Sequence, residues 1–168
     1  MNIIKLLKIN NIFTLLNATS GLLCIFFAII GNFRIAVVLL IIAAFFDYFD
    51  GKSSRKRKIA NKFGKELDSL ADIISFGLAP CVFVFLLLKD IRFVWVYILY
   101  LLAGLIRLAR FNITKTGNYF EGMPMTVSGI VVPILYFVLS GSNLSYIYYI
   151  YFILATFLMV SSIRFKKL

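Results

Sequence analysis

The chain has 168 residues, of which 62% are hydrophobic, and its mean hydropathy of +0.97 excludes an ordinary soluble domain, which is about 45–50% apolar. The net charge of +11 in a membrane protein suggests anionic headgroups and phosphates as partners, and no nucleic acid is expected. The sequence contains no histidine, which excludes Ser-His-Asp catalysis and any His-ligated metal site in this chain.

Apolar segments predict an all-α polytopic membrane protein with six transmembrane helices, because a helix needs about 20 apolar residues to cross the hydrocarbon core. The predicted spans are residues 12–30, 33–49, 67–88, 93–111, 125–139 and 146–162. The second helix is expected to continue past the lipid. The opening MNIIKLLKIN predicts a short amphipathic helix at the membrane surface. No room remains for a separate soluble domain, so residues 1–168 are expected to form a single domain.

The distribution of the 18 Lys and Arg residues predicts the orientation. Most of them fall at one membrane face, whereas only Arg34, Lys89 and Arg92 fall at the other. The positive-inside rule then places both termini at the cytoplasmic face of the cytoplasmic (inner) membrane. Residues 47–72, which hold most of the acidic residues, are expected at the same face.

Several other residues receive structural interpretations. Cys24 and Cys81 lie in apolar runs and are expected to be small core side chains. Lys65 is expected to be a solvated loop residue, and Glu66 to cap the third predicted helix. The aromatic run YIYYIYFILATF in the last span is expected to face lipid and the membrane interface.

Four aspartates flank the second loop. Asp47 and Asp50 are three residues apart, and Asp68 and Asp72 are four apart, so each pair lies on one face of a helix. The loop that joins the two helices contains Gly64, and the two pairs can therefore face each other. Four like charges so close together cannot all stay ionised unaided in a poorly hydrated site.

Three arrangements relieve this repulsion. Proton uptake would suit a proton-coupled transporter, and pairing with Arg55 or Arg57 would give a structural network. Two divalent cations would balance four carboxylates, and oxygen ligands suit Mg²⁺ or Mn²⁺. Gly51 lets the backbone approach a ligand closely, and Arg55 can hold a phosphate. These neighbours favour metals and phosphoryl-type transfer.

The spacing across residues 47–72 resembles the signature of the CDP-alcohol phosphotransferase family. The matching pattern is Asp47-x2-Asp50-Gly51-x2-Ser54-Arg55-x8-Gly64-x3-Asp68-x3-Asp72. Ser54 departs from it, because the family usually has Ala there, but both residues are small. NIFTLLNATSG (11–21), ELDSLADIISFGLAP (66–80), RLARFN (107–112) and FEGMP (120–124) look like the serine-accepting branch of the family, the CDP-diacylglycerol–serine O-phosphatidyltransferases. The resemblance covers roughly residues 10–135.

The resemblance implies six membrane helices, a homodimer and an active site open to the cytoplasm. It implies a site for two divalent cations, Mg²⁺ or Mn²⁺, held by Asp47, Asp50, Asp68 and Asp72, with Asp72 also the catalytic base. It implies that the CDP group is bound by Thr14, Asn17, Gly51, Ser54, Arg55 and Gly64. Arg107, Arg110 and Asn112 are expected to bind the acceptor or the lipid phosphate, although the two arginines also fit helix-end cations that meet headgroups.

The expected reaction transfers the phosphatidyl group from CDP-diacylglycerol to the hydroxyl of L-serine, which gives phosphatidylserine and CMP. The partners are therefore a CDP-activated lipid, serine and membrane lipids. CDP-archaeol in place of CDP-diacylglycerol, and glycerol phosphate or inositol phosphate in place of serine, remain alternatives. A small cation transporter that uses the aspartates as an ion site is the alternative of a different class.

Overall fold

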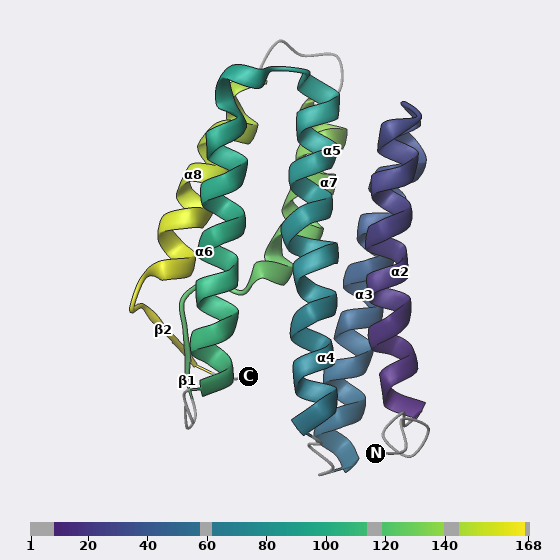
Figure 1. The fold of residues 1–168 in the computed structure, drawn as a ribbon, viewed down its shortest axis with the longest axis vertical. Helices are drawn as coiled ribbons and strands as arrows, with labels where there is room; N and C mark the ends of the chain where they lie inside the picture. Colours follow the sequence, from purple (N-terminus) through teal and green to yellow (C-terminus); the bar gives the residue numbers. More distant parts are fainter. Residues whose placement is uncertain (1–8, 58–61, 114–118, 140–144, 167–168) are drawn as a thin grey trace.

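The computed structural model describes residues 9–57, 62–113, 119–139 and 145–166, and most of these residues are helical (Figure 1). The α-helices are α2 (Ile9–Ile29), α3 (Phe33–Arg57), α4 (Lys62–Asp72), α5 (Ala79–Leu88), α6 (Val94–Ile113), α7 (Ser128–Leu139) and α8 (Tyr146–Val160). A π-helical turn, η1 (Ile73–Leu78), joins α4 to α5 without a break, and two 3-10 turns, η2 (Ile91–Phe93) and η3 (Met125–Val127), precede α6 and α7. The described chain therefore forms six helical rods, which confirms the predicted all-α class.

The six rods correspond to the six predicted spans. Among the described residues, three segments are long and apolar enough to cross a membrane, namely Asn11–Ile29, Phe63–Leu88 and Ile91–Ile113. Met125–Leu139 and Tyr146–Val160 are shorter apolar helices. The chain is a multi-pass membrane protein. The predicted amphipathic helix falls almost wholly outside the described residues.

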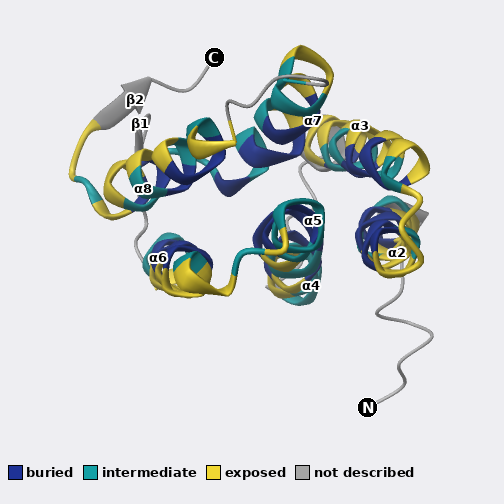
Figure 2. Ribbon diagram, turned by 90° about the horizontal axis from the view of Figure 1, so that it is seen from above, coloured by how far each residue is buried: buried dark blue, intermediate teal, exposed yellow. Residues whose placement is uncertain are grey.

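The rods pack in two rows. Viewed from above, α2, α4–α5 and α6 form one row, and α3, α7 and α8 form the other, with buried residues turned toward the space between the rows (Figure 2). The start of α2, the end of α3 and the start of α4 lie at the same, lower end in Figure 1. The parts of α3 and α4 that carry the aspartates therefore lie at the same end of the molecule as the start of α2.

A short β-ribbon is the one strand structure in the described part of the chain. β1 (Tyr119–Glu121) pairs antiparallel with β2 (Arg164–Lys166), so that Phe120 lies opposite Phe165. Beside it, the Met123 N–H donates to the Leu158 carbonyl at 3.1 Å. The ribbon thus ties the segment that follows α6 to the end of α8.

Pro80 accounts for the π-helical turn. Proline has no N–H, so the Phe76 carbonyl, four residues earlier, receives no α-helical hydrogen bond. The chain widens instead, and the Ala79 N–H donates to the Ile74 carbonyl five residues back. The Tyr100 hydroxyl of α6 donates to the open Phe76 carbonyl at 2.8 Å. A backbone group that lipid could not satisfy is therefore satisfied by a neighbouring helix.

The aromatic residues of α8 correct one prediction. The rings of Tyr149 and Phe152 are buried, and both pack against Tyr97 of α6. The prediction that this run faces lipid is wrong for that side of the helix, while Leu154 and Phe157 on other sides are exposed. Rings on the buried side fill the core between α6 and α8. The two cysteines are free and buried, as predicted.

Gly21 permits the closest approach of α2 to η1. A Cβ atom on Gly21 would lie 2.6 Å from the Cα atom of Ser75, which is backbone and cannot rotate away. We expect Gly21→Ala to lower the free energy of unfolding by about 1–3 kcal/mol, the usual range for overpacking. The measurement is thermal unfolding in detergent. Gly77→Ala is the matched control, because its Cβ would meet the end of the Leu101 side chain at 2.9 Å. Equal losses in the two variants would contradict the prediction.

Candidate metal centre

Three carboxylates from two helices converge near the lower end of the molecule. Asp47 lies on α3, and Asp68 and Asp72 lie on α4. Each offers one oxygen atom, and these three oxygens all lie within 4.8 Å of one another. Such a set of hard oxygen donors fits Mg²⁺ or Mn²⁺. The cluster that the spacing of the aspartates predicts is therefore present, and it could hold a metal ion.

Asp50 lies beside this cluster. It is buried, and its Oδ2 accepts a hydrogen bond of 2.6 Å from the Thr14 hydroxyl of α2. It also lies within hydrogen-bonding reach of Asp68. The structure therefore brings all four aspartates together, with one of them also held by the first helix.

Asn17 of α2 approaches the cluster from the same side. Its Nδ2 donates to Asp72 Oδ1 at 3.4 Å, and its side-chain Oδ1 is buried with no hydrogen-bond partner among the described atoms. An open buried acceptor is costly unless a ligand supplies a donor. Thr14 and Asn17, which were predicted to bind the nucleotide, thus lie against Asp50 and Asp72.

No described Lys or Arg forms an ion pair with Asp47, Asp68 or Asp72. By contrast, Asp90, at the start of η2, is bound by the Arg92 guanidinium at 2.8 and 2.9 Å, which holds the pKa of its carboxyl below the usual value. The ionised carboxylates of the cluster repel one another, and their negative charge needs compensation. A cation ligand fits this requirement better than a structural salt-bridge network built from the described residues.

Arg107 on α6 is a described cation whose charge acts on Asp72. The Arg107 side chain is only 8% exposed, and its charge attracts the Asp72 carboxylate. Its Nε–H has no hydrogen-bond partner among the described atoms. A buried, unpaired guanidinium N–H beside a carboxylate cluster is suited to hold an anionic ligand.

Arg110 and Asn112 make protein contacts instead. Arg110 Nη2 donates to the Ser161 carbonyl beyond α8 at 3.2 Å. Asn112 Nδ2 donates to Glu66 Oε2 at 3.1 Å, and its amide also exchanges hydrogen bonds with Ser69 of α4. Asn112 therefore joins the end of α6 to α4 through Glu66 and Ser69, which lie on either side of Asp68 in the chain.

Lys65 and Glu66 take part in the same junction. Lys65 Nζ donates to the Phe111 carbonyl at 3.1 Å and to the Asn112 carbonyl at 3.4 Å. It satisfies carbonyls near the end of α6, where a cation also meets the negative end of the helix dipole. Lys65 is exposed, as predicted, but it lies in α4 rather than in a loop. The prediction that Glu66 caps the third helix is wrong, because Glu66 lies inside α4 and accepts a hydrogen bond from Asn112.

The remaining predicted nucleotide residues lie around the end of α3 and the start of α4. Gly51 is exposed on α3, next to Asp50. Ser54 and Arg55 belong to α3, but their side chains lie outside the described part of the structure. Gly64 lies in α4, where a Cβ atom would stand 3.4 Å from Asn11 Oδ1, an ordinary contact distance. These positions border the aspartate cluster along the chain.

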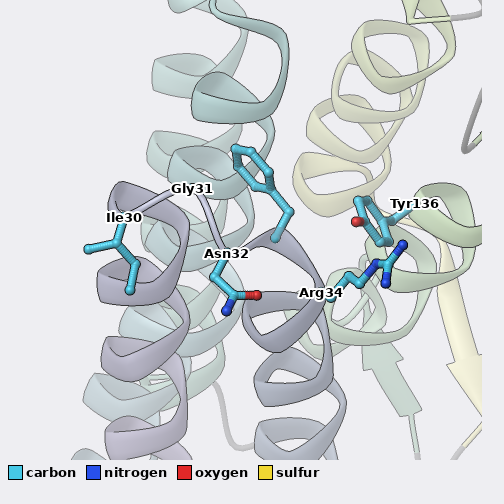
Figure 3. Close-up of a pocket in the computed structure, with 6 residues that line it drawn as sticks. Ile30, Gly31, Asn32, Arg34 and Tyr136 are labelled. Atoms are coloured by element: carbon cyan, nitrogen blue, oxygen red, sulfur yellow. The ribbon is translucent and has the colours of Figure 1, made fainter.

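A hollow at the other end of the molecule is remote from this cluster. It has a volume of about 410 Å³ and lies at the turn between α2 and α3, beside Arg34 and Tyr136 (Figure 3). Gly31 makes the turn with φ of +80°, a conformation that favours glycine. Arg34 and Asp47 are thirteen residues apart on α3, which corresponds to roughly 20 Å along the helix. The hollow is therefore separate from the carboxylates.

Ser75 is a residue near the site that the sequence did not single out. Its hydroxyl donates to the Asn17 carbonyl at 2.8 Å, which joins η1 to α2 where Asn17 meets Asp72. The sequence offers one signal for Ser75, its position three residues after Asp72 and five before Pro80. That signal can be used only when the π-helical turn is known.

These features define a class: a multi-pass membrane protein in which two helices bring half-buried and buried carboxylates together, flanked by a buried asparagine and arginine. The family model for CDP-alcohol phosphatidyltransferase matches residues 7–164. The chain belongs to this family and is an enzyme of the CDP-alcohol phosphotransferase class.

Three curated relatives illustrate the similarity. An archaetidylserine synthase from Methanothermobacter thermautotrophicus is 35% identical, over 98% of this chain and 72% of the relative. A CDP-diacylglycerol–serine O-phosphatidyltransferase from Bacillus subtilis is 34% identical, over 74% of this chain and 72% of the relative. The enzyme of the same name from Saccharomyces cerevisiae is 37% identical over 76% of this chain, which spans only 53% of that relative.

Proposed function

We propose that the protein transfers the phosphatidyl group of CDP-diacylglycerol to the hydroxyl of L-serine and releases CMP. The observation that carries the chemistry is the convergence of Asp47, Asp68 and Asp72 beside Asn17 and Arg107 in a chain of this family. The choice of serine is supported by the names of the relatives, which share the serine acceptor. Residues 1–168 act as one domain in this proposal.

The carboxylates fit a pair of divalent cations, Mg²⁺ or Mn²⁺. The donors are all oxygen atoms, three of them already lie within 4.8 Å of one another, and the described part of the chain supplies no ion pair to them. Asp47, Asp50, Asp68 and Asp72 would hold the ions. When bound, such ions stabilise negative charge on phosphate oxygens and on a leaving phosphate.

The nucleotide end of the substrate is assigned to residues near α2 and the α3–α4 junction. Thr14 and Asn17 line the cluster from α2, and the open Asn17 Oδ1 can accept an N–H of the ligand. Gly51, Ser54, Arg55 and Gly64 complete the proposed CDP site at the ends of α3 and α4. Gly51 lets the backbone approach closely, and Arg55 supplies a fixed cation for phosphate. The lipid tails remain in the membrane.

Asp72 is the proposed general base. The serine hydroxyl oxygen attacks the phosphorus that bears the lipid, and its proton passes to the Asp72 carboxylate. A new P–O bond to serine forms as the P–O bond to CMP breaks, so that CMP leaves with the bridging oxygen. Asn17 Nδ2, which donates to Asp72 Oδ1, leaves the second carboxylate oxygen to accept that proton.

Arg107 is assigned to the serine carboxylate. Its buried Nε–H is an unpaired donor beside Asp72, and a guanidinium binds a carboxylate through parallel hydrogen bonds. Arg110 and Asn112 support this end of the site indirectly in this proposal, since both already bond to neighbouring segments. Of the three residues that the resemblance assigns to the acceptor or the lipid phosphate, only Arg107 is proposed to contact the acceptor directly.

Charge and topology support a proposed location. The cations near the lower end of the molecule support an active site that faces the cytoplasm, in a cytoplasmic membrane, by the positive-inside rule. A homodimer, as the family resemblance suggests, is retained as part of the proposal.

CDP-archaeol is the second candidate lipid. The similarity to the archaetidylserine synthase covers 98% of this chain, more than the similarity to the Bacillus or yeast enzymes does. Diacyl and diether tails present similar hydrocarbon to the helices, so both lipids share the chemistry at phosphorus.

An acceptor panel tests the proposed function. The purified protein is given CDP-diacylglycerol or CDP-archaeol with Mn²⁺, and then serine, glycerol phosphate or inositol phosphate in turn. We expect CMP release that depends on serine, and little with the phosphorylated acceptors, which would need additional cations in the site. Release only with a phosphorylated acceptor would replace serine. Metal flux into vesicles without CMP release from any mixture would favour the cation-transporter alternative.

A further inference from the structure

A chain of three buried hydroxyls supports the π-helical turn. Tyr100 Oη donates to the Phe76 carbonyl at 2.8 Å, which uses its only proton. Tyr100 also contacts the Ser128 hydroxyl of α7, so Ser128 must be the donor in that bond. Ser128 in turn lies 2.7 Å from the Tyr151 hydroxyl of α8, which must therefore donate to it. The hydrogen bonds run in one direction, from α8 through α7 and α6 to the carbonyl.

The π-helical turn controls where Asp72 points. Asp72 is the residue that immediately precedes η1. An α-helix advances about 100° per residue, so one extra residue in a turn rotates the faces on either side of it by about that angle. If the turn relaxed or moved along the helix, Asp72 would rotate away from Asp47, or the core side of α5 would leave the interior.

The neighbours of η1 fix it from the other sides as well. The Ser75 hydroxyl bonds to the Asn17 carbonyl, and Gly21 allows that approach. A Cβ atom on Gly129 of α7 would lie 2.5 Å from the Phe76 ring. Consecutive residues of η1 are therefore clamped by α2 on one side and by α7 on another, while the open carbonyl depends on Tyr100 alone among the described hydrogen bonds.

We propose that Tyr100 and Ser128 are positioning residues for Asp72: their hydroxyls hold the Phe76 carbonyl, which fixes the π-helical turn and the direction of the catalytic carboxylate. Neither residue touches the substrate in this arrangement. The inference rests on the proposed role of Asp72 in phosphatidyl transfer. It assigns a catalytic consequence to a hydrogen-bond chain that links α6, α7 and α8.

The test compares two tyrosines on the same helix. Tyr97 lies one turn before Tyr100, is also buried, and packs edge-on against Phe152 as Tyr100 does. Tyr100→Phe and Tyr97→Phe each remove one hydroxyl from this core, but only the first leaves the Phe76 carbonyl open. We measure kcat and KM with serine, the dissociation constant of Mn²⁺ by electron paramagnetic resonance, and thermal unfolding.

We expect Tyr100→Phe to lower kcat by roughly ten- to a hundredfold, because a misplacement of about 1 Å can have that effect, with little change in the KM for serine. Mn²⁺ binding is expected to weaken in parallel, and Ser128→Ala to act in the same direction. Tyr97→Phe is expected to keep the kcat and the Mn²⁺ affinity of the unmodified protein.

Two outcomes overturn the inference: unchanged kcat and Mn²⁺ affinity in both Tyr100→Phe and Ser128→Ala, or equal losses in Tyr100→Phe and Tyr97→Phe. Failure of the proposed function is distinguishable, because the unmodified protein would then release no CMP with serine. In that case, the Mn²⁺ dissociation constants of Tyr100→Phe and Tyr97→Phe still test whether Tyr100 positions Asp72.

Discussion

Asp72→Asn is expected to lower turnover with serine by about 10²–10⁴-fold, the contribution of a general base, while the CDP-lipid still binds. The amide has almost the same shape as the carboxylate, and its oxygen can still accept the bond that Asn17 donates at 3.4 Å. It cannot take up the serine proton. The measurement is kcat for CMP release, together with binding of the CDP-lipid to the variant.

Asp90→Asn provides the control for this change. Asp90 is paired with Arg92 at the start of η2, far along the chain from the cluster, and should not affect kcat. Metal dependence separates two roles of Asp72, because a residue that only held metal would regain activity when Mn²⁺ is raised. Full activity of Asp72→Asn would remove it as the base.

Removal of divalent cations is expected to reduce activity at least a hundredfold. Metal stabilisation of a transferring phosphoryl group contributes several kcal/mol, and about 1.4 kcal/mol corresponds to a factor of ten. Chelation followed by dialysis should abolish CMP release, and addition of Mg²⁺ or Mn²⁺ should restore it. The repulsion among Asp47, Asp68 and Asp72, whose oxygens lie within 4.8 Å, is the physical reason for the dependence.

Asp68→Asn separates a metal effect from a general effect of the chelator. One carboxylate charge is lost from the cluster, so Mn²⁺ binding should weaken, and more Mn²⁺ should be needed for half-maximal activity. Persistent full activity in chelated protein, with no bound metal detected, would contradict a metal-dependent reaction.

Hydrophobicity predicted the number and order of the helices but not where they begin. The third span was expected from residue 67, whereas the helix begins at Lys62. The polar KFGKE segment is helical outside the apolar stretch, and apolarity marks the passage through lipid rather than the end of a helix. For the second span, the expected continuation past the lipid is confirmed, because α3 extends to Arg57.

Spacing predicted the cluster because residues three or four apart share a helix face, and the loop brings the two faces together. Contacts between distant helices carry no such local signal. The bond from Asn112 to Glu66 and the approach of Asn17 to Asp72 depend on how α2, α4 and α6 pack. Pro80 within an apolar run was a visible sign of an irregular helix, but not of the tyrosine that compensates it.

In the proposed reaction, the oxygen of the serine hydroxyl becomes part of the new phosphate ester of the lipid. This reaction is tested most directly with serine labelled by ¹⁸O in its hydroxyl, given to the purified protein with the CDP-lipid and Mn²⁺, followed by mass spectrometry of both products. We expect a serine-containing phospholipid that retains the ¹⁸O, and unlabelled CMP in equal amount. A protein that is folded and binds the CDP-lipid, yet forms no serine-containing lipid, would contradict the proposed reaction.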